Sequence, residues 1–316
     1  MNIQRWVARR EQSWKQLDQL LKQVERRGLK SLRAEEIHQL ASLYRSVAGD
    51  LARARTQQVG TLIEQRLQTL TARAYSQIYQ GSQHQEWRAI REFYLWGFPA
   101  VVQRSQGYIA LAVFLFVAAA LVSWWLAWRD PTFLELVVPP DLISQVRDQQ
   151  KLWTGSIVGI EPFASSSIMI NNIRVSFLAM AGGITAGLLT LYIALINGVL
   201  IGTIGALVGQ NNLAFPFWAF VFPHGALELP AIFLALAAGF LLARAILFPG
   251  HYRRSDALKH NGEQAAQLMF GSVPILVIAG IIEGFFSPNP AVPNLLKYAT
   301  GITLFVLLIS YLGRKK

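Results

Sequence analysis

The chain has 316 residues, 53% of them hydrophobic, and its mean hydropathy is +0.34, a value that soluble domains of this size do not usually reach. The absence of cysteine excludes disulfides and thiolate metal sites. A formal charge of +11 can indicate nucleic-acid binding, but the basic residues flank long apolar runs, where the positive-inside rule explains them. We therefore expect an integral membrane protein that contacts lipids and binds no nucleic acid.

Residues 1–95 predict a cytoplasmic, basic helical domain. Apolar side chains recur at helical spacing in three stretches, at residues 14–24, 37–51 and 62–79. Gly28 is a natural stop for the first helix, Ser31 can cap the second, and Gly81 ends the third. Over residues 1–106 there are seventeen Lys and Arg against nine Asp and Glu. This excess predicts either a solvated surface beside an anionic leaflet or a docking face for an acidic partner.

Residues 96–106 predict an interfacial linker. Aromatic side chains alternate with arginines up to Arg104, which is typical of a helix in the headgroup layer, and Pro99 would bend the chain into the first span. The remaining residues, 107–316, predict a transmembrane domain. Its apolar runs place spans at residues 108–128, 175–196, 197–222, 226–247, 268–286 and 296–312.

The segment between the first two predicted spans is poor in positive charge. Residues 129–173 contain three basic and five acidic residues, so the positive-inside rule places this loop outside. Its amphipathic segments predict helices on the outer membrane surface. Asn171 and Asn172 are expected in this outer loop.

Three basic segments decide the predicted topology. The N-terminal domain, residues 251–260 and the C-terminal "GRKK" should all be cytoplasmic, which requires an even number of crossings. The long apolar runs number five, so residues 197–247 must supply a further crossing or a re-entrant pair. We expect the chain to break at Pro223–Gly225, because non-helical backbone at membrane depth is tolerated inside protein or beside a wet cavity. Asn197 is a candidate for a second break.

Small-xxx-small spacing occurs three times in the apolar region that begins near residue 175. The pairs are Gly183 with Gly187, Gly198 with Gly202, and Gly205 with Gly209. Such spacing lets helix backbones approach closely in lipid. It predicts packing within one protomer, or alternatively a homodimer.

The stretch "FPHGALELPAI" places polar side chains where an apolar span is expected. His224 and Glu228 lie one helical turn apart, with Gly225 and Pro230 beside them. A carboxylate at bilayer depth costs several kcal/mol unless it is paired, hydrogen-bonded or protonated. We expect a polar network, to which Asn197 and Glu283 also belong. The network either stabilises a helix break or forms a functional pocket.

Most catalytic motifs are missing. His-x-x-x-Glu is not the zincin pattern, and no G-x-S-x-G elbow or P-loop is present. The other histidines fall in predicted cytoplasmic segments, at His38, His84, His251 and His260. We therefore predict no catalytic residue, no metal site and no cofactor. Two alternatives remain open: a transporter or lipid-translocating protein with a pocket around Glu228 and Glu283, and an intramembrane hydrolase that uses these carboxylates with water.

Four stretches together carry a family resemblance. "NNIRVSFLAMAGGITAG", "LINGVLIG", "FPHGALELPAI" and "AGIIEGFFSP" resemble the stage II sporulation protein M family, over residues 95–316. The N-terminal domain is similar to the long form of that family. The positions that match the family motif are Asn171, Asn172, Asn197, Gly198, His224, Gly225, Glu228, Pro230, Glu283 and Pro288.

The resemblance implies a scaffolding role. In spore formers, the family member is the membrane scaffold of an engulfment complex that positions peptidoglycan-degrading enzymes; the long form has no settled activity. We therefore expect an all-α, polytopic transmembrane helical protein with broken or re-entrant helices, preceded by a small cytoplasmic helical bundle. It should be a non-enzymatic scaffold of the bacterial inner membrane, with both termini cytoplasmic and with membrane or envelope proteins as unidentified partners.

Overall fold

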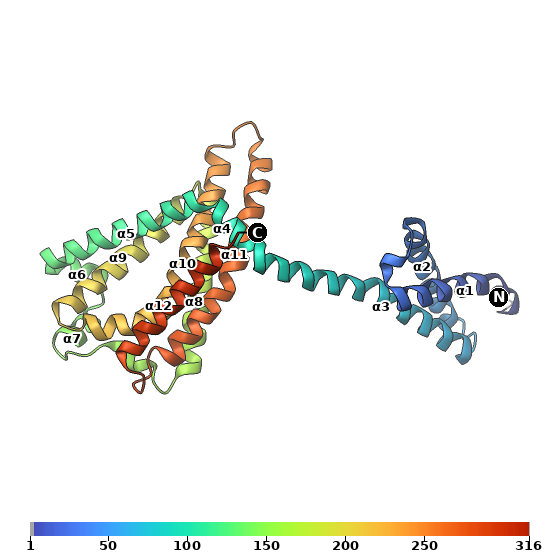
Figure 1. Ribbon diagram of the computed structural model, residues 1–316, viewed down its shortest axis with the longest axis horizontal. Coiled ribbons are helices and arrows are strands. Elements are labelled where there is room, and N and C mark those ends of the chain that lie inside the picture. The colour runs from blue at the N-terminus through green and yellow to red at the C-terminus, as the bar shows by residue number, and fades with distance from the viewer. Residues whose placement is uncertain (1–2, 316) are drawn as a thin grey trace. The chain divides into compact units, whose positions relative to one another are not determined.

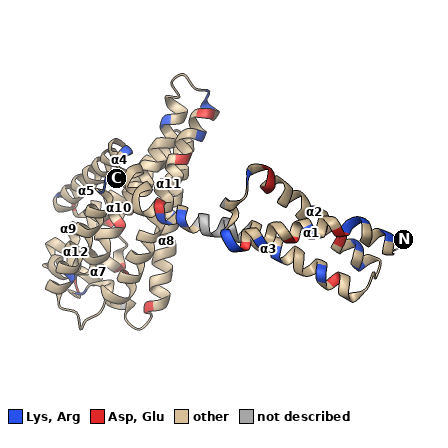
Figure 2. Cartoon of the chain, turned by 45° about the vertical axis from the view of Figure 1, so that its right-hand side comes forward, with Lys and Arg blue, Asp and Glu red and all other residues tan. Residues whose placement is uncertain are grey.

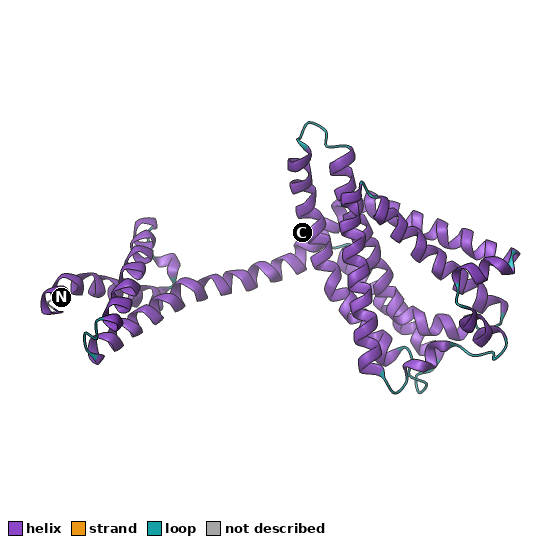
Figure 3. Cartoon of the chain, turned by 180° about the vertical axis from the view of Figure 1, so that it is seen from behind, coloured by secondary structure: helices purple, strands orange, loops and turns teal. Residues whose placement is uncertain are grey.

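The computed structural model describes residues 3–315, and every regular element among them is a helix (Figure 3). The chain divides into two compact units, residues 1–92 and residues 93–316. The all-α prediction is therefore confirmed. The division falls three residues before the domain boundary that the sequence suggested.

The first unit is a helical bundle. It contains α1 (Ile3–Arg27), the short 3₁₀ helix η1 (Leu29–Ser31), α2 (Ala34–Thr56) and α3 (Thr61–Glu92). Gly28 follows α1 with a φ of 76°, a conformation that glycine adopts without strain. Two expected boundaries were wrong. Arg33, rather than Ser31, occupies the N-cap of α2, and α3 continues through Gly81 to Glu92 because the sequence after residue 81 has no helix breaker.

The bundle has its own hydrophobic core with one buried carboxylate. Trp14, Leu17 and Leu21 of α1 are at most 1% exposed, as the helical spacing predicted. Asp50 of α2 accepts hydrogen bonds from Trp14 Nε1 at 2.9 Å and from Arg10 Nε at 2.8 Å. At the surface, hydrogen bonds from Lys22 and Arg73 lower the pKa of Asp18 below its usual value.

The second unit contains the remaining helices. They are the π-helical turn η2 (Phe93–Gly97), α4 (Phe98–Arg104), α5 (Gln106–Arg129), α6 (Pro131–Val137), α7 (Pro140–Arg147), η3 (Trp153–Ile157), α8 (Glu161–Ala181), η4 (Gly182–Thr185), α9 (Leu188–Gln210), α10 (Ala214–Leu247), α11 (Arg254–Ile281), the π-helical turn η5 (Ile282–Phe286) and α12 (Asn294–Leu312). Charged side chains are sparse along the helices of this unit (Figure 2).

Six of the described helical segments are long and apolar enough to cross a membrane. They are Gln106–Arg129, Glu161–Thr185, Leu188–Gln210, Ala214–Leu247, Arg254–Phe286 and Asn294–Leu312. An even number of candidate spans was expected, but the additional span arises elsewhere than predicted. The apolar run after residue 175 divides at Gly182–Gly187, where Ala186 and Gly187 both have positive φ.

The predicted break at Pro223–Gly225 was wrong. Helix α10 is continuous, with Pro223 and Pro230 in its interior. Prolines are tolerated within membrane helices because neighbouring helices and side chains satisfy the backbone groups that they free. A second expectation also fails, because Asn171 and Asn172 lie within α8 rather than in an outer loop. Its serines and asparagines make Glu161–Thr185 the least apolar of the six candidate spans, and so concealed it.

Part of the predicted interfacial linker, residues 96–106, packs into the core of the second unit. Phe98 of α4 is 1% exposed and belongs to a core cluster with residues of α10, α11 and α12. Its ring contacts Gly271 of α11 so closely that a methyl group there would overlap it. Val101 and Val102 of α4 belong to the same cluster, whereas Trp96 is 38% exposed.

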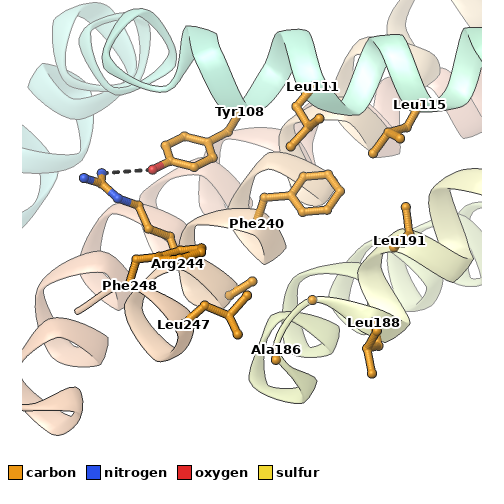
Figure 4. A pocket seen from close by; sticks show the side chains of 12 residues that line it. Tyr108, Leu111, Leu115, Ala186, Leu188, Leu191, Phe240, Arg244, Leu247 and Phe248 are labelled. Atoms are coloured by element: carbon orange, nitrogen blue, oxygen red, sulfur yellow. Dashed lines mark hydrogen bonds between the residues drawn. The ribbon is translucent and has the colours of Figure 1, made fainter. Parts of the chain in front are cut away.

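Helix α10 is central to the second unit. It packs against α11, α12, α8 and α5, while α5 and α9 form a second close pair (Figure 1). A cavity of about 540 Å³ lies between α5, the start of α9 and the end of α10. Its lining is almost entirely apolar, and at its edge Arg244 Nη1 donates a hydrogen bond of 3.0 Å to the Tyr108 hydroxyl (Figure 4).

Candidate functional site: a buried His–Glu–Glu cluster

Polar side chains from α10 and the turn η5 meet inside the second unit. His224 and Glu228 lie one turn apart on α10, and both face Glu283 of the π-helical turn η5. The side chain of His224 is 6% exposed and that of Glu283 is 14% exposed. One ligand atom from each of the three residues lies within 4.8 Å of the others. The structure thus brings together the three ionisable residues of the predicted motif.

Local geometry explains why these side chains converge. The i, i+4 spacing on an uninterrupted α10 places His224 and Glu228 on one face. The wider turn of η5 follows directly on α11 and carries Glu283. Single π-helical turns inside longer helices are frequent at functional sites. Glu283 lies three residues before the end of its candidate span at Phe286, so the cluster is near the end of α11.

Two further residues complete the cluster, and sequence reasoning missed both. Ser287 Oγ lies 3.0 Å from His224 Nδ1, and Ser287 is fully buried. Lys297 of α12 is 7% exposed, and its Nζ donates a hydrogen bond of 2.6 Å to the Ser287 carbonyl oxygen. A signal for Lys297 was available, because a lysine inside a predicted span is by default paired or functional. No comparable signal marked Ser287, since its pairing with His224 joins residues 63 positions apart.

Not every polar atom in the cluster has a hydrogen-bond partner among the described residues. His224 Nε2 and Glu283 Oε1 are 3.8 Å apart, beyond the 2.7–3.2 Å typical of a hydrogen bond. Glu283 Oε2 is buried and has no hydrogen-bond partner among the described residues. Buried polar atoms in native proteins nearly always have a partner. The donor set of one imidazole and two carboxylates can hold a divalent cation. The shortage of histidines in the predicted spans led us to expect no metal site, but one histidine with two carboxylates is also a ligand set for a divalent cation.

The other residues that the sequence analysis singled out beside the ionisable ones do not belong to the cluster. Asn197 is within α9 and its Nδ2 donates to the Ile193 carbonyl oxygen at 2.8 Å, so it marks no break. Gly225 and Pro230 line a second, apolar cavity of about 680 Å³ between α10 and α12. The side chains of Asn171 and Asn172 are 3.5 Å apart on α8.

The six predicted packing glycines occupy different surroundings. Gly198 and Gly202 of α9 face α5, where an added methyl group would overlap the carbonyl oxygens of Phe116 and Ala120. Gly183 is equally close to the backbone of α10 at Gly239, and Gly187 lies opposite Ala243. Gly205 and Gly209 are looser. Their nearest neighbours are tryptophan rings of Trp218 and Trp128, at 3.4 and 3.6 Å from an added methyl group.

Comparison with known proteins identifies the family. A family model described as Stage II sporulation protein M matches residues 112–288, more than half of the chain. The chain belongs to this family. The matched region contains His224, Glu228, Glu283 and Ser287 of the cluster, but it ends before Lys297. Residues 4–80 match a second model, described as Domain of unknown function (DUF8413).

The family member has an archaeal relative among known proteins. An uncharacterized protein of the archaeon Methanocaldococcus jannaschii is 30% identical over 131 residues, which cover 41% of this chain and 74% of that protein. No solved structure matches the chain significantly.

Proposed function

We propose that this family member is a non-enzymatic integral membrane scaffold that recruits or positions cell-envelope or membrane-complex proteins. The observation that carries the proposal is the division of the chain into two units with separate cores. One unit has six helices suited to a membrane, and the other is a basic helical bundle without such a helix among its described residues. This combination provides a membrane anchor and a separate surface for partners.

The same division supports an orientation. If all six candidate spans cross the membrane, the bundle, the 248–253 connection and the C-terminus lie on one side. The basic stretches "HYRR", at the junction of this connection with α11, and "GRKK" lie on that side, which the positive-inside rule then assigns to the cytoplasm. We infer a location in the bacterial inner membrane with both termini cytoplasmic.

If the protein is a scaffold, the role of the cluster is to stabilise the membrane domain. His224 on α10, Ser287 after η5 and Lys297 on α12 form a continuous chain of hydrogen bonds that joins three elements. Replacing Glu228 by glutamine keeps the size of the side chain. The scaffold proposal therefore requires that partners are retained in this variant whenever the fold is retained.

The test is purification of the tagged protein from its native membrane in mild detergent, followed by mass spectrometry. Wild type, Glu228→Gln and a chain without residues 1–92 should be compared. We expect the same envelope or membrane proteins to be enriched with wild type and Glu228→Gln, and to be lost without the bundle. Wild type that is folded and arrives alone would contradict the proposal.

The cluster itself favours a second candidate, a transporter or lipid-translocating protein. Glu228 and Glu283 belong to candidate spans, and the apolar cavities of about 540 and 680 Å³ border α10. In this case Glu228→Gln and Glu283→Gln should leave folding and partners intact but abolish a flux in proteoliposomes.

A homodimer is a separate proposal. A strictly monomeric mass in nanodiscs, measured by mass photometry, would rule it out.

A further inference from the structure

The buried cluster has the features of a site for a positively charged ligand. Its three ligand-type residues are His224, Glu228 and Glu283, and one ligand atom from each lies within 4.8 Å of the other two. These side chains contribute a nitrogen and carboxylate oxygens, the donor types that bind Zn²⁺ and similar first-row divalent cations. We propose that they hold one such cation between α10 and η5.

Distances favour an ion over a direct hydrogen bond. Two ligands on a tetrahedral Zn²⁺, each at about 2.0–2.2 Å from the metal, lie about 3.4 Å from one another. The 3.8 Å between His224 Nε2 and Glu283 Oε1 is close to this spacing and too long for a hydrogen bond. Shifts of about 1 Å in the side chains bring all three ligands into range. Glu283 Oε2 is buried and has no hydrogen-bond partner among the described residues. A bound cation would give this oxygen a positive charge to interact with.

The surroundings of His224 match those of a metal ligand. A metal-bound histidine nearly always donates its second ring N–H to an acceptor, which fixes the tautomer and the orientation of the ring. In the tautomer with the proton on Nδ1, Ser287 Oγ at 3.0 Å accepts this hydrogen bond and the Nε2 lone pair faces Glu283. Ser287 is itself held by Lys297 Nζ through its carbonyl oxygen. Ser287 is therefore a positioning residue of the proposed site.

Metal binding should be measured on the full-length chain, purified with a tag that contains no histidine. After equilibration with Zn²⁺ and gel filtration, elemental analysis should find about one Zn²⁺ per wild-type chain. His224→Ala and Glu283→Gln should weaken binding by more than the roughly 10–100-fold expected for Ser287→Ala, which removes only an outer partner. Glu263→Gln, which changes an exposed glutamate on α11, the helix that precedes η5, should bind as wild type does.

A second measurement of metal binding uses the wild-type chain, so it does not require that a variant folds. Co²⁺ loaded into the wild-type chain should give the intense visible absorption of a four-coordinate ion, and Zn²⁺ should displace it. Wild type that binds no Zn²⁺, a Co²⁺ spectrum like that of the hydrated ion, or Glu228→Gln and Glu283→Gln chains with unchanged affinity would each overturn the proposal. Any of these results would leave the scaffold proposal intact, because that proposal depends on partners and not on an ion.

Discussion

Substituting Gly202 by alanine is expected to destabilise the membrane domain by about 2–3 kcal/mol. The new methyl group would overlap the Ala120 carbonyl oxygen and the Ser123 hydroxyl on α5. Neither neighbour can move freely, because the first is backbone and Ser123 Oγ donates a hydrogen bond to Val199. Helices α5 and α9 would have to separate, and dispersion contacts along this close pair would be lost.

Thermal unfolding of the detergent-solubilised protein measures this effect. Gly209→Ala is the matched control, since the same substitution about two turns further along α9 meets only the Trp128 ring at 3.6 Å, an ordinary contact. We expect Gly209→Ala to change stability by less than about 0.5 kcal/mol. Equal destabilisation by both substitutions would mean that Gly202 has no special role in the α5–α9 contact.

In the basic bundle, Asp50→Ala is expected to cost about 2–4 kcal/mol, because it leaves Trp14 Nε1 and Arg10 without their common acceptor. Asp50 is 1% exposed, so water cannot replace the carboxylate without disturbing the core. Hydrogen exchange in peptides from α1 and α2 of the full-length chain reports the loss directly.

Asp18→Ala is the control for this second prediction. Asp18 also pairs with basic side chains, Lys22 and Arg73, but at a partly exposed position. Surface ion pairs contribute about 0–1 kcal/mol, so exchange should accelerate much less than in Asp50→Ala. Similar acceleration in the two variants would show that the burial of Asp50 adds nothing to its contribution.

Much of the fold was predictable because its signals are local. The charge-free run at residues 108–128 predicted α5, which spans Gln106–Arg129. Helical spacing likewise identified Trp14, Leu17 and Leu21 as one apolar face, and all three are buried. A continuous apolar run or a stripe of period 3.6 depends only on neighbouring residues, so a single sequence reveals it.

The errors arose where tertiary packing decides the outcome. Pro223 and Pro230 are local helix breakers, yet surrounding helices keep α10 intact. Helix α8 was hidden because Ser165 and Ser176 look polar in sequence, whereas in the structure both are buried between helices and Ser165 donates to the Gly280 carbonyl oxygen.

The candidate site was predictable only in part. The pair His224 and Glu228 follows from helical spacing, and Glu283 was recognised as a carboxylate in an apolar run. Their actual meeting, and the contributions of Ser287 and Lys297, depend on how α10, η5 and α12 pack. Spacing along the chain carries no information about those contacts.

Single-cysteine labelling tests the six-span topology most directly, and the chain suits it because it contains no cysteine. A membrane-impermeant maleimide would be applied to intact cells that carry one cysteine, at Gln57, His251, Lys315, Lys151 or Ala291. We predict labelling at Lys151 and Ala291 in intact cells, and at Gln57, His251 and Lys315 only after permeabilisation. Labelling of His251 and Ala291 from the same side would contradict the topology, because α11 and η5 would then not cross the membrane.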